Sequence, residues 1–113
     1  MKVIIEDLAK RCLDDILYHN MQYSVKNAIE TDIDIFKHFY FLEYSPYIGK
    51  YVSKIPDKRF RELLYKKKKN TYRIIYYISE SINTVHIIHV SNCKQDFNRI
   101  LKLHNYFNNY FNF

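Results

Sequence analysis

The stretch "YKKKKNTYRIIYYISESINTVHIIHV" (residues 65–90) joins a run of four lysines to two segments typical of β-strands. Segments 71–79 ("TYRIIYYIS") and 83–90 ("NTVHIIHV") are rich in Ile, Val and Tyr, and a short polar break separates them. This pattern predicts an antiparallel hairpin. Segment 59–65 ("RFRELLY") has a similar composition, so we expect three consecutive antiparallel strands, with the lysines at the tip between the first two.

The residues before these strands predict a strand and two helices. In chain order we expect a strand at 2–6, a helix from about 8 to 21 with Asp7 as its cap, a turn at 20–24 and a helix at 25–41. Pro46, Gly49 and Pro56 predict an irregular connection with no helix or strand. A last helix is expected after the third strand of the meander, followed by an Asn-rich tail. Helices gathered on one face of an antiparallel sheet define an α+β fold.

Apolar residues that recur at helical spacing give the candidate core of the two helices. The first helix offers Leu8, Cys12, Leu13, Ile16 and Leu17, and the second offers Val25, Ile29, Ile33, Phe36 and Tyr40. We expect the helices to cover one face of the sheet and to leave the other face open.

The chain has 113 residues, a length that fits one domain, and carries a formal net charge of +6. A basic chain favours acidic partners such as nucleic acid or an acidic protein. Cys12 and Cys93 match no zinc spacing, and Cys12 is expected to be a buried thiol. We find no signal-peptide pattern and no apolar run of about 18 residues, so we expect a cytoplasmic protein that does not enter a membrane.

Strand alternation puts Tyr72, Ile74, Tyr76 and Ile78 on one face and Arg73 on the other. We assign the first set to the core and Arg73 to the open face. Arg59, Arg61 and Arg73 would then form a cationic cluster that suits phosphate or carboxylate groups. The alternative reading is an ordinary ion pair between Arg73 and Glu62 on the neighbouring strand.

The lysine run also has two readings. It is either a solvated loop or a surface that binds the phosphates of a nucleic acid or an acidic partner without sequence preference. The lysines concerned are Lys66, Lys67, Lys68 and Lys69. His86 and His89 are three residues apart in one strand, so we expect them to face opposite ways and to form no metal site. The chain has no Gly-rich phosphate loop, and we expect no cofactor.

Several motifs, in their order along the chain, resemble the RelE/ParE family of bacterial toxin–antitoxin toxins. The motifs are "SPYIGKYV" (45–52), "FRELLY" (60–65), "YRIIYYI" (72–78), "NTVHIIHV" (83–90) and "NCKQDF" (92–97). The resemblance covers about residues 1–101 and implies a single toxin domain there. Residues 102–113 lie outside the pattern, and we expect this aromatic and Asn-rich tail either to extend the last helix or to fray. It also implies a cognate antitoxin as partner, in a hetero-oligomeric complex.

The resemblance implies two different activities. RelE-like members cleave mRNA on the ribosome, and ParE-like members poison DNA gyrase without catalytic residues of their own. If the chain is a ribonuclease, the family pattern assigns catalytic roles to Arg61, Arg73 and Lys94. Two residues depart from that pattern. Leu63 occupies the next inward position that some RelE-like members use, and Asn92 stands where many members have His. We expect gyrase poisoning, with RNA cleavage as the alternative and an inactive antitoxin-binding relative as a further alternative.

Overall fold

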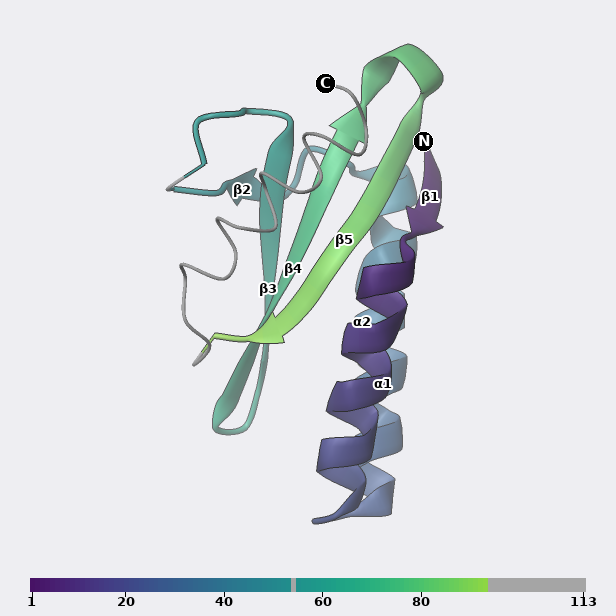
Figure 1. The fold of residues 1–113 in the computed structure, drawn as a ribbon, viewed down its shortest axis with the longest axis vertical. Coiled ribbons are helices and arrows are strands. Elements are labelled where there is room, and N and C mark those ends of the chain that lie inside the picture. The colour runs from purple at the N-terminus through teal and green to yellow at the C-terminus, as the bar shows by residue number, and fades with distance from the viewer. Residues whose placement is uncertain (54, 94–113) are drawn as a thin grey trace.

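The computed structural model describes residues 1–53 and 55–93, which form two helices and a five-stranded sheet (Figure 1). The elements are β1 (Lys2–Ile5), α1 (Asp7–Met21), α2 (Val25–Tyr44), β2 (Lys50–Tyr51), β3 (Phe60–Lys67), β4 (Asn70–Ser79), a 3-10 turn (Glu80–Ile82) and β5 (Thr84–Asn92). The strand order is β1-β5-β4-β3-β2. This confirms the predicted α+β class. The predicted last helix and the boundary at residue 101 lie outside the described residues.

The three-stranded meander forms as predicted. β3 pairs with β4 and β4 pairs with β5, both antiparallel. Two features depart from the prediction: β1 pairs in parallel with β5 at one edge, and β2 lies within the segment expected to be irregular and pairs with Glu62 and Arg61 of β3. A two-residue strand is too short to give an alternation signal, which is why the sequence does not reveal β2.

The turn between the helices also forms where it was expected. The side chain of Ser24 accepts a hydrogen bond from the backbone N–H of Asn27 (3.2 Å), so Ser24 caps α2. The cap predicted at Asp7 is wrong by one residue. Glu6 holds the N-cap position of α1 without a side-chain cap, and its carboxylate instead lies 2.8 Å from Nδ1 of His86.

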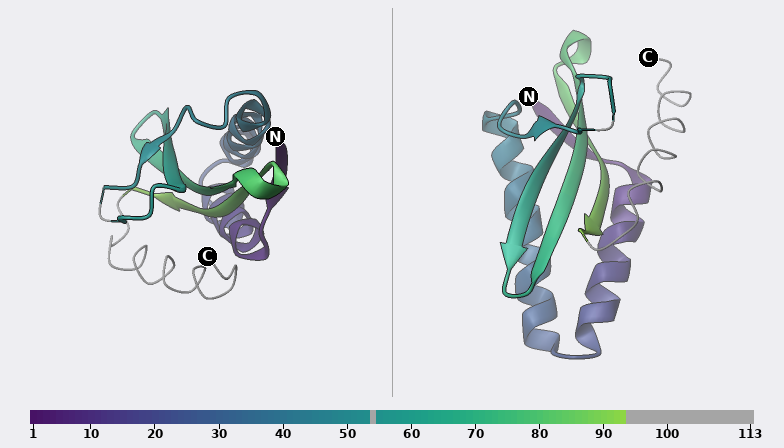
Figure 2. Two further views of the ribbon diagram at one scale, coloured as in Figure 1. Left: turned by 90° about the horizontal axis from the view of Figure 1, so that it is seen from above. Right: turned by 90° about the vertical axis from the view of Figure 1, so that its left-hand side faces the viewer.

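The main core lies between both helices and one face of the sheet. Figure 2 shows the helices running side by side along the strands. The sheet contributes Tyr72, Ile74, Tyr76 and Ile78, as predicted, and the helices contribute Ala9, Leu13, Ile35, Phe39 and Leu42. Cys12 is half-buried against this cluster rather than fully buried.

The face of α2 that was predicted to be buried is wrong at every position except Phe36, which packs against the main core. Val25, Ile29, Ile33 and Tyr40 are exposed, and Ala28, Ile35, Phe39 and Leu42 are buried in their place. α2 carries two apolar stripes, and periodicity identifies both without telling which one meets the sheet.

The second face of the sheet is only partly open. Val52 and Ile55, from the connection between β2 and β3, pack against Phe60, Ile75, Tyr77 and Ile88 in a second apolar cluster. The expectation of a fully free face is therefore wrong. Among the described helices, none is long and apolar enough to cross a bilayer.

Candidate functional site

Arg73 is half-buried and takes part in an ion pair. Its Nε lies 3.0 Å from Oε2 of Glu62, and the two side chains are 16% and 9% exposed. The ammonium group of Lys50 lies 4.0 Å from the other carboxylate oxygen of Glu62. The alternative reading of Arg73 as the partner of Glu62 is thus the one that the structure supports.

Arg61 lies on the opposite face of the sheet from Arg73. Arg61 pairs with Tyr76 of β4, whose side chain lies in the main core, so Arg61 lies on the core face of the sheet. Arg73 lies on the other face, together with Ile75 of the second apolar cluster. Nη1 of Arg61 donates hydrogen bonds to the backbone carbonyls of Tyr47 (3.1 Å) and Gly49 (2.7 Å). The predicted cluster of three arginines is wrong, because register places Arg61 and Arg73 on different faces.

Arg59 lies before β3 and is held by Asp57. Its Nε and Nη2 donate to the two carboxylate oxygens of Asp57 at 2.9 and 2.6 Å. These hydrogen bonds raise the pKa of the Arg59 guanidinium. Its charge is therefore largely matched by a local carboxylate, which reduces its attraction for an external anion.

Three cations and three tyrosines nevertheless gather in one cavity of about 450 Å³, here named the cation–tyrosine cleft (Tyr47, Tyr51, Lys58, Arg59, Arg61 and Tyr77). The Arg61 guanidinium lies 4.5 Å from the centre of the Tyr51 ring and 5.3 Å from that of Tyr47. Arg59 lies 5.3 Å from the Tyr77 ring, and Lys58 lies 5.8 Å from the Tyr51 ring. These contacts place positively charged groups beside aromatic rings, a combination suited to binding nucleotides.

The sequence pattern does not predict this cleft. The tyrosines come from the irregular connection, from β2 and from β4, so only the fold brings them together. One side of the cleft carries a carboxylate, that of Glu80, which accepts a hydrogen bond from the hydroxyl of Tyr47 (2.6 Å). That hydrogen bond raises the pKa of Tyr47.

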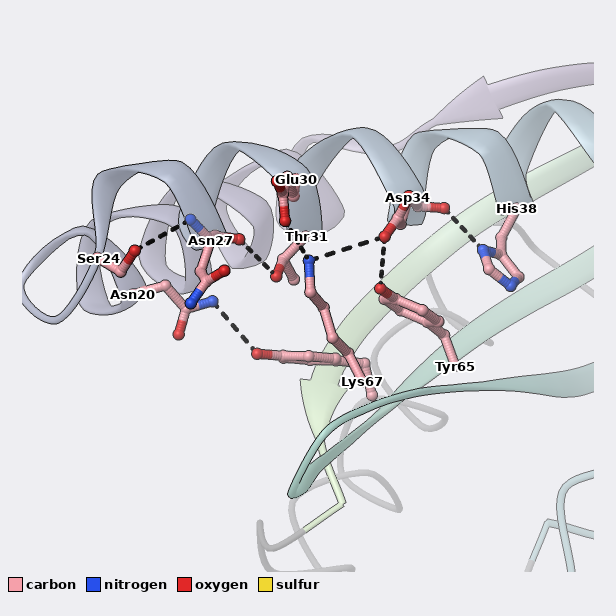
Figure 3. A network of polar contacts seen from close by, with 10 residues as sticks. Asn20, Ser24, Asn27, Glu30, Thr31, Asp34, His38, Tyr65 and Lys67 are labelled. Atoms are coloured by element: carbon pink, nitrogen blue, oxygen red, sulfur yellow. Dashed lines mark hydrogen bonds and ion pairs between the residues drawn. The ribbon is translucent and has the colours of Figure 1, made fainter.

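The lysine run is divided between two roles. Lys66 and Lys67 end β3, and Lys68 and Lys69 form the turn. Lys66, Lys68 and Lys69 are exposed. Lys67 instead reaches between Glu30 (3.5 Å) and Asp34 (3.9 Å) of α2 (Figure 3). Three of the four lysines thus remain available to an acidic partner, and Lys67 attaches the hairpin to the helix.

Tyr65 strengthens the same attachment. Its hydroxyl donates to Oδ2 of Asp34 at 2.7 Å, and Asn20 donates to the hydroxyl of Tyr72 at 3.2 Å (Figure 3). Burial and the hydrogen bond to Asp34 raise the pKa of Tyr65 well above its ordinary value. We call the contacts of Tyr65 and Lys67 with α2 the hairpin latch.

His86 and His89 face the same way, contrary to the prediction. The pairing of β4 with β5 shifts between Ile75 and Tyr76, which leaves Ile88 as an extra residue. His86 pairs with Tyr77 and His89 with Ile75, so both follow one face. Within residues 1–53 and 55–93, no cluster of three metal-ligating side chains occurs.

Lys94 lies outside the described residues, so its predicted role stays a prediction. Asn92, at the end of β5, donates from Nδ2 to Oδ1 of Asn70 (3.1 Å) and lies beside a cavity of about 540 Å³ between α1 and the sheet. Arg11, His19 and His89 also line this cavity. Strand and helix patterns do not predict it, because its walls come from elements distant in sequence.

Comparison with known proteins agrees with the fold described above. No family model and no curated protein sequence matches the chain. A solved chain of the RelBE2 toxin–antitoxin complex from Mycobacterium tuberculosis aligns with a TM-score of 0.60 and 17% identity, over 80% of this chain and 95% of that one. A chain of the chromosomal ParDE toxin–antitoxin system from P. aeruginosa aligns with a TM-score of 0.66 and 16% identity, over 81% and 95%.

The structure therefore has a RelE/ParE-like toxin fold, as the motifs predicted. The TM-scores of 0.60 and 0.66 establish the fold, and identities of 16% and 17% leave the activity to the chemistry of the site.

Proposed function

We propose that the chain is the toxin component of a type II toxin–antitoxin system and acts in the cytoplasm, where a cognate antitoxin protein binds and neutralises it. The observation that carries this proposal is the extent of the structural match. It covers 95% of two chains that come from toxin–antitoxin complexes, so nearly the whole fold of each neighbour is represented here.

We further propose that the toxin inhibits growth by poisoning DNA gyrase, as ParE-like members do. Cleavage of RNA would need cationic groups gathered around one phosphate to stabilise its developing negative charge. Arg61 and Arg73 lie on opposite faces of the sheet, and Glu62 already pairs with Arg73. This arrangement argues against the catalytic roles that the family pattern assigns to both, and it favours a mechanism that needs no catalytic residues.

Ribosome-dependent mRNA cleavage remains the second candidate because of the cation–tyrosine cleft. Arg61 and Lys58 lie over tyrosine rings there, in a cavity large enough for a nucleotide. A base stacked on a tyrosine and a phosphate beside Arg61 would fit the general chemistry of single-strand binding. The cleft thus offers an RNA surface even though the predicted arginine cluster does not form.

The test is inducible expression in a bacterial host with two molecular readouts. Gyrase poisoning predicts growth arrest together with gyrase-linked DNA breaks and a DNA-damage response, and co-expression of the antitoxin should relieve the arrest. RNA cleavage predicts mRNA ends within the ribosomal A site and no gyrase-linked breaks. Folded protein that causes no arrest would favour the inactive antitoxin-binding relative.

Variants of the cleft separate the two mechanisms further. Tyr51→Ala removes the ring on which Arg61 lies, and the half-exposed Tyr51 is not in either core cluster. If the chain cleaves RNA at the cleft, Tyr51→Ala should lower the yield of cleaved mRNA about tenfold, in line with the loss of one stacking contact. If it poisons gyrase elsewhere, arrest should persist. Tyr18→Ala, at an exposed position on α1 away from the cleft, is the matched control.

A further inference from the structure

α2 carries a second apolar face that no described residue covers. We define the α2 stripe as Val25, Ile29, Ile33, Tyr40 and Tyr44, which recur at steps of four and seven along the helix. Their side chains range from 49% exposed at Ile29 and Ile33 to 82% exposed at Tyr44. At 100° per residue they lie within about 100° of one another, so they form one continuous band.

This band is unusual for a helix that already has a buried face. The opposite side of α2 fills the core with Ile35, Phe39 and Leu42. A surface helix ordinarily presents polar residues to water, and monomeric proteins rarely expose apolar patches of more than a few hundred Å². Over the 20 residues of α2 the band extends about 30 Å. Its length and continuity indicate an interaction surface for another helix.

The two borders of the α2 stripe carry opposite charges. Projected down the helix, Lys26 and Lys37 lie along one border, and Asp32 and Glu43 lie along the other. Glu30 also lies beside the basic border, but its carboxylate is paired with Lys67 (3.5 Å). Burial and, to a smaller extent, the charge of Asp14 on α1 raise the pKa of Asp32, so Asp14 adds to the acidic border. Among the residues that the structure describes, neither Asp14 nor Asp32 forms an ion pair. Asp32 therefore lacks a basic partner within the described part of the chain, whereas at Glu43 the N-terminal ammonium group of Met1 donates to the backbone carbonyl (2.8 Å).

A surface with one basic and one acidic border is complementary to a copy of itself in a single orientation. In a parallel pair of α2 helices related by a twofold axis, the basic border of each faces the acidic border of the other. Asp32 and Lys37 are five residues apart, which is the spacing of ion pairs across parallel helices. An antiparallel pair would instead bring lysines to lysines and carboxylates to carboxylates. The charges therefore select both the occupant and its direction.

We propose that the α2 stripe is a homodimer interface in which two copies of the chain pack α2 against α2 in parallel. The side chains of Ile33 and Tyr40 form its apolar centre, and Asp32 pairs with Lys37 of the second copy on each side. The proposal does not depend on the proposed toxin function, since it concerns self-association of the purified chain.

The first test measures mass in solution by light scattering and analytical ultracentrifugation at concentrations up to roughly 100 μM, since a dimer population depends on protomer concentration. The wild-type chain should dimerise. Ile33→Asp should weaken dimerisation at least about thirtyfold, the effect expected at the centre of an interface. Phe41→Asp is the matched control: Phe41 is 48% exposed on the same helix but lies off the stripe, so its dimer should match that of the wild type.

The second test reads the orientation. In the parallel dimer, Asp32→Lys and Lys37→Asp should each weaken association about fivefold, because attraction becomes repulsion at two symmetric sites. The double variant should recover the wild-type affinity. In an antiparallel dimer each single change would relieve repulsion and strengthen association.

Two results would overturn the proposal. One is a wild-type chain that stays monomeric over this concentration range, while circular dichroism shows it folded. The other is a monomer whose Ile33→Asp variant loses capture of the antitoxin while Phe41→Asp keeps it. That outcome would assign the α2 stripe to the antitoxin instead of a second copy.

Discussion

Arg73 illustrates how far alternation along a strand predicts the role of one residue. The pattern in 72–78 correctly places Arg73 on the face opposite Ile74 and Tyr76. Its role depends on the neighbouring strand, where Glu62 follows the same face and lies 3.0 Å away. Register between strands is not written in either strand alone, so the sequence left the ion pair and the arginine cluster as alternatives.

Replacement of Arg73 should therefore act on stability first. Among the described residues, Arg73→Ala leaves the buried Glu62 with the Lys50 ammonium, 4.0 Å away, as its one counter-charge. We expect the free energy of unfolding to fall by about 3 kcal/mol. Urea denaturation measures this. The double variant Arg73→Met, Glu62→Leu removes both charges and should recover most of the loss. An Arg73→Ala protein as stable as the wild type would show that the pair contributes little.

Lys68 occupies a backbone conformation that lysine seldom adopts. It is the first residue of the two-residue turn between β3 and β4, and its φ is 53°. Left-handed backbone costs a side chain with an ordinary Cβ about 1–2 kcal/mol, and Asn tolerates it better. Lys68→Asn should raise the free energy of unfolding by about 0.5–1 kcal/mol in chemical denaturation. Lys69→Asn, next to it, is the control and should give no gain.

Among the elements, α2 shows where helical periodicity stops being informative. The pattern predicted the existence and start of the helix correctly, and Ser24, the last residue of the predicted turn, caps it. It chose the wrong face, because α2 has an apolar stripe on each of two sides. The buried one contains Ala28 and Thr31, small or polar residues that a search for large apolar side chains passes over.

The hairpin latch should make the protein sensitive to alkali. The pKa of Tyr65 is raised in the folded state, so folding holds its proton more tightly than the unfolded chain does, whose tyrosines titrate near pH 10. Stability from this group is complete below about pH 10 and is lost as the pH rises above it. Burial also raises the pKa of Tyr76 and Tyr77, which adds to the same loss.

We expect Tyr65→Phe to flatten this alkaline loss. At pH 8 the variant should be less stable than the wild type, because it lacks the hydrogen bond to Asp34. The difference in stability between the two proteins should shrink between about pH 10 and 11. Thermal melts across this range measure both effects. Tyr18→Phe, at an exposed position, controls for the removal of a tyrosine. A constant difference across the range would rule out titration of the latch.

Substitutions in the lysine run should distinguish a lysine that is paired within the protein from one that is free to contact a partner. Lys66→Ala should lower the salt dependence of binding to a short DNA duplex by about 1 in log–log slope, because each phosphate contact releases about one counterion. Lys67→Ala should leave that slope unchanged, because its ammonium group already lies between Glu30 and Asp34. Equal effects of the two changes would mean that Lys67 leaves the latch when DNA binds.

For the whole molecule, the sequence predicted the architecture more fully than the site. Local patterns were enough for the meander and both helices, and the motifs that resemble the RelE/ParE family predicted the fold. The cation–tyrosine cleft and the shared face of His86 and His89 were missed for a common reason. The first needs the irregular connection to fold against β4, and the second needs the extra residue Ile88 in β5. Both depend on contacts between distant segments or on a one-residue change of register.

Gly49, the one glycine of the chain, joins that connection to the sheet. Its N–H donates to the hydroxyl of Tyr76 (2.9 Å), which in turn donates to the carbonyl of Pro46 (2.7 Å). A Cβ at this position would lie 2.7 Å from the carbonyl oxygen of Glu62 and 2.8 Å from Cε1 of Tyr76. Any other residue would force β2 away from β3.

The proposed toxin function gives this crowding a genetic consequence. Under that proposal, cells that survive induction without the antitoxin carry mutations that inactivate the chain. At a position that accepts only one residue type, almost every missense change would inactivate it. Codon 49 should therefore be enriched among surviving missense alleles from a mutagenised library, relative to exposed codons such as 18 or 23. Sequencing survivors before and after induction measures this enrichment, and survivors without it would mean that the connection can shift without loss of toxicity.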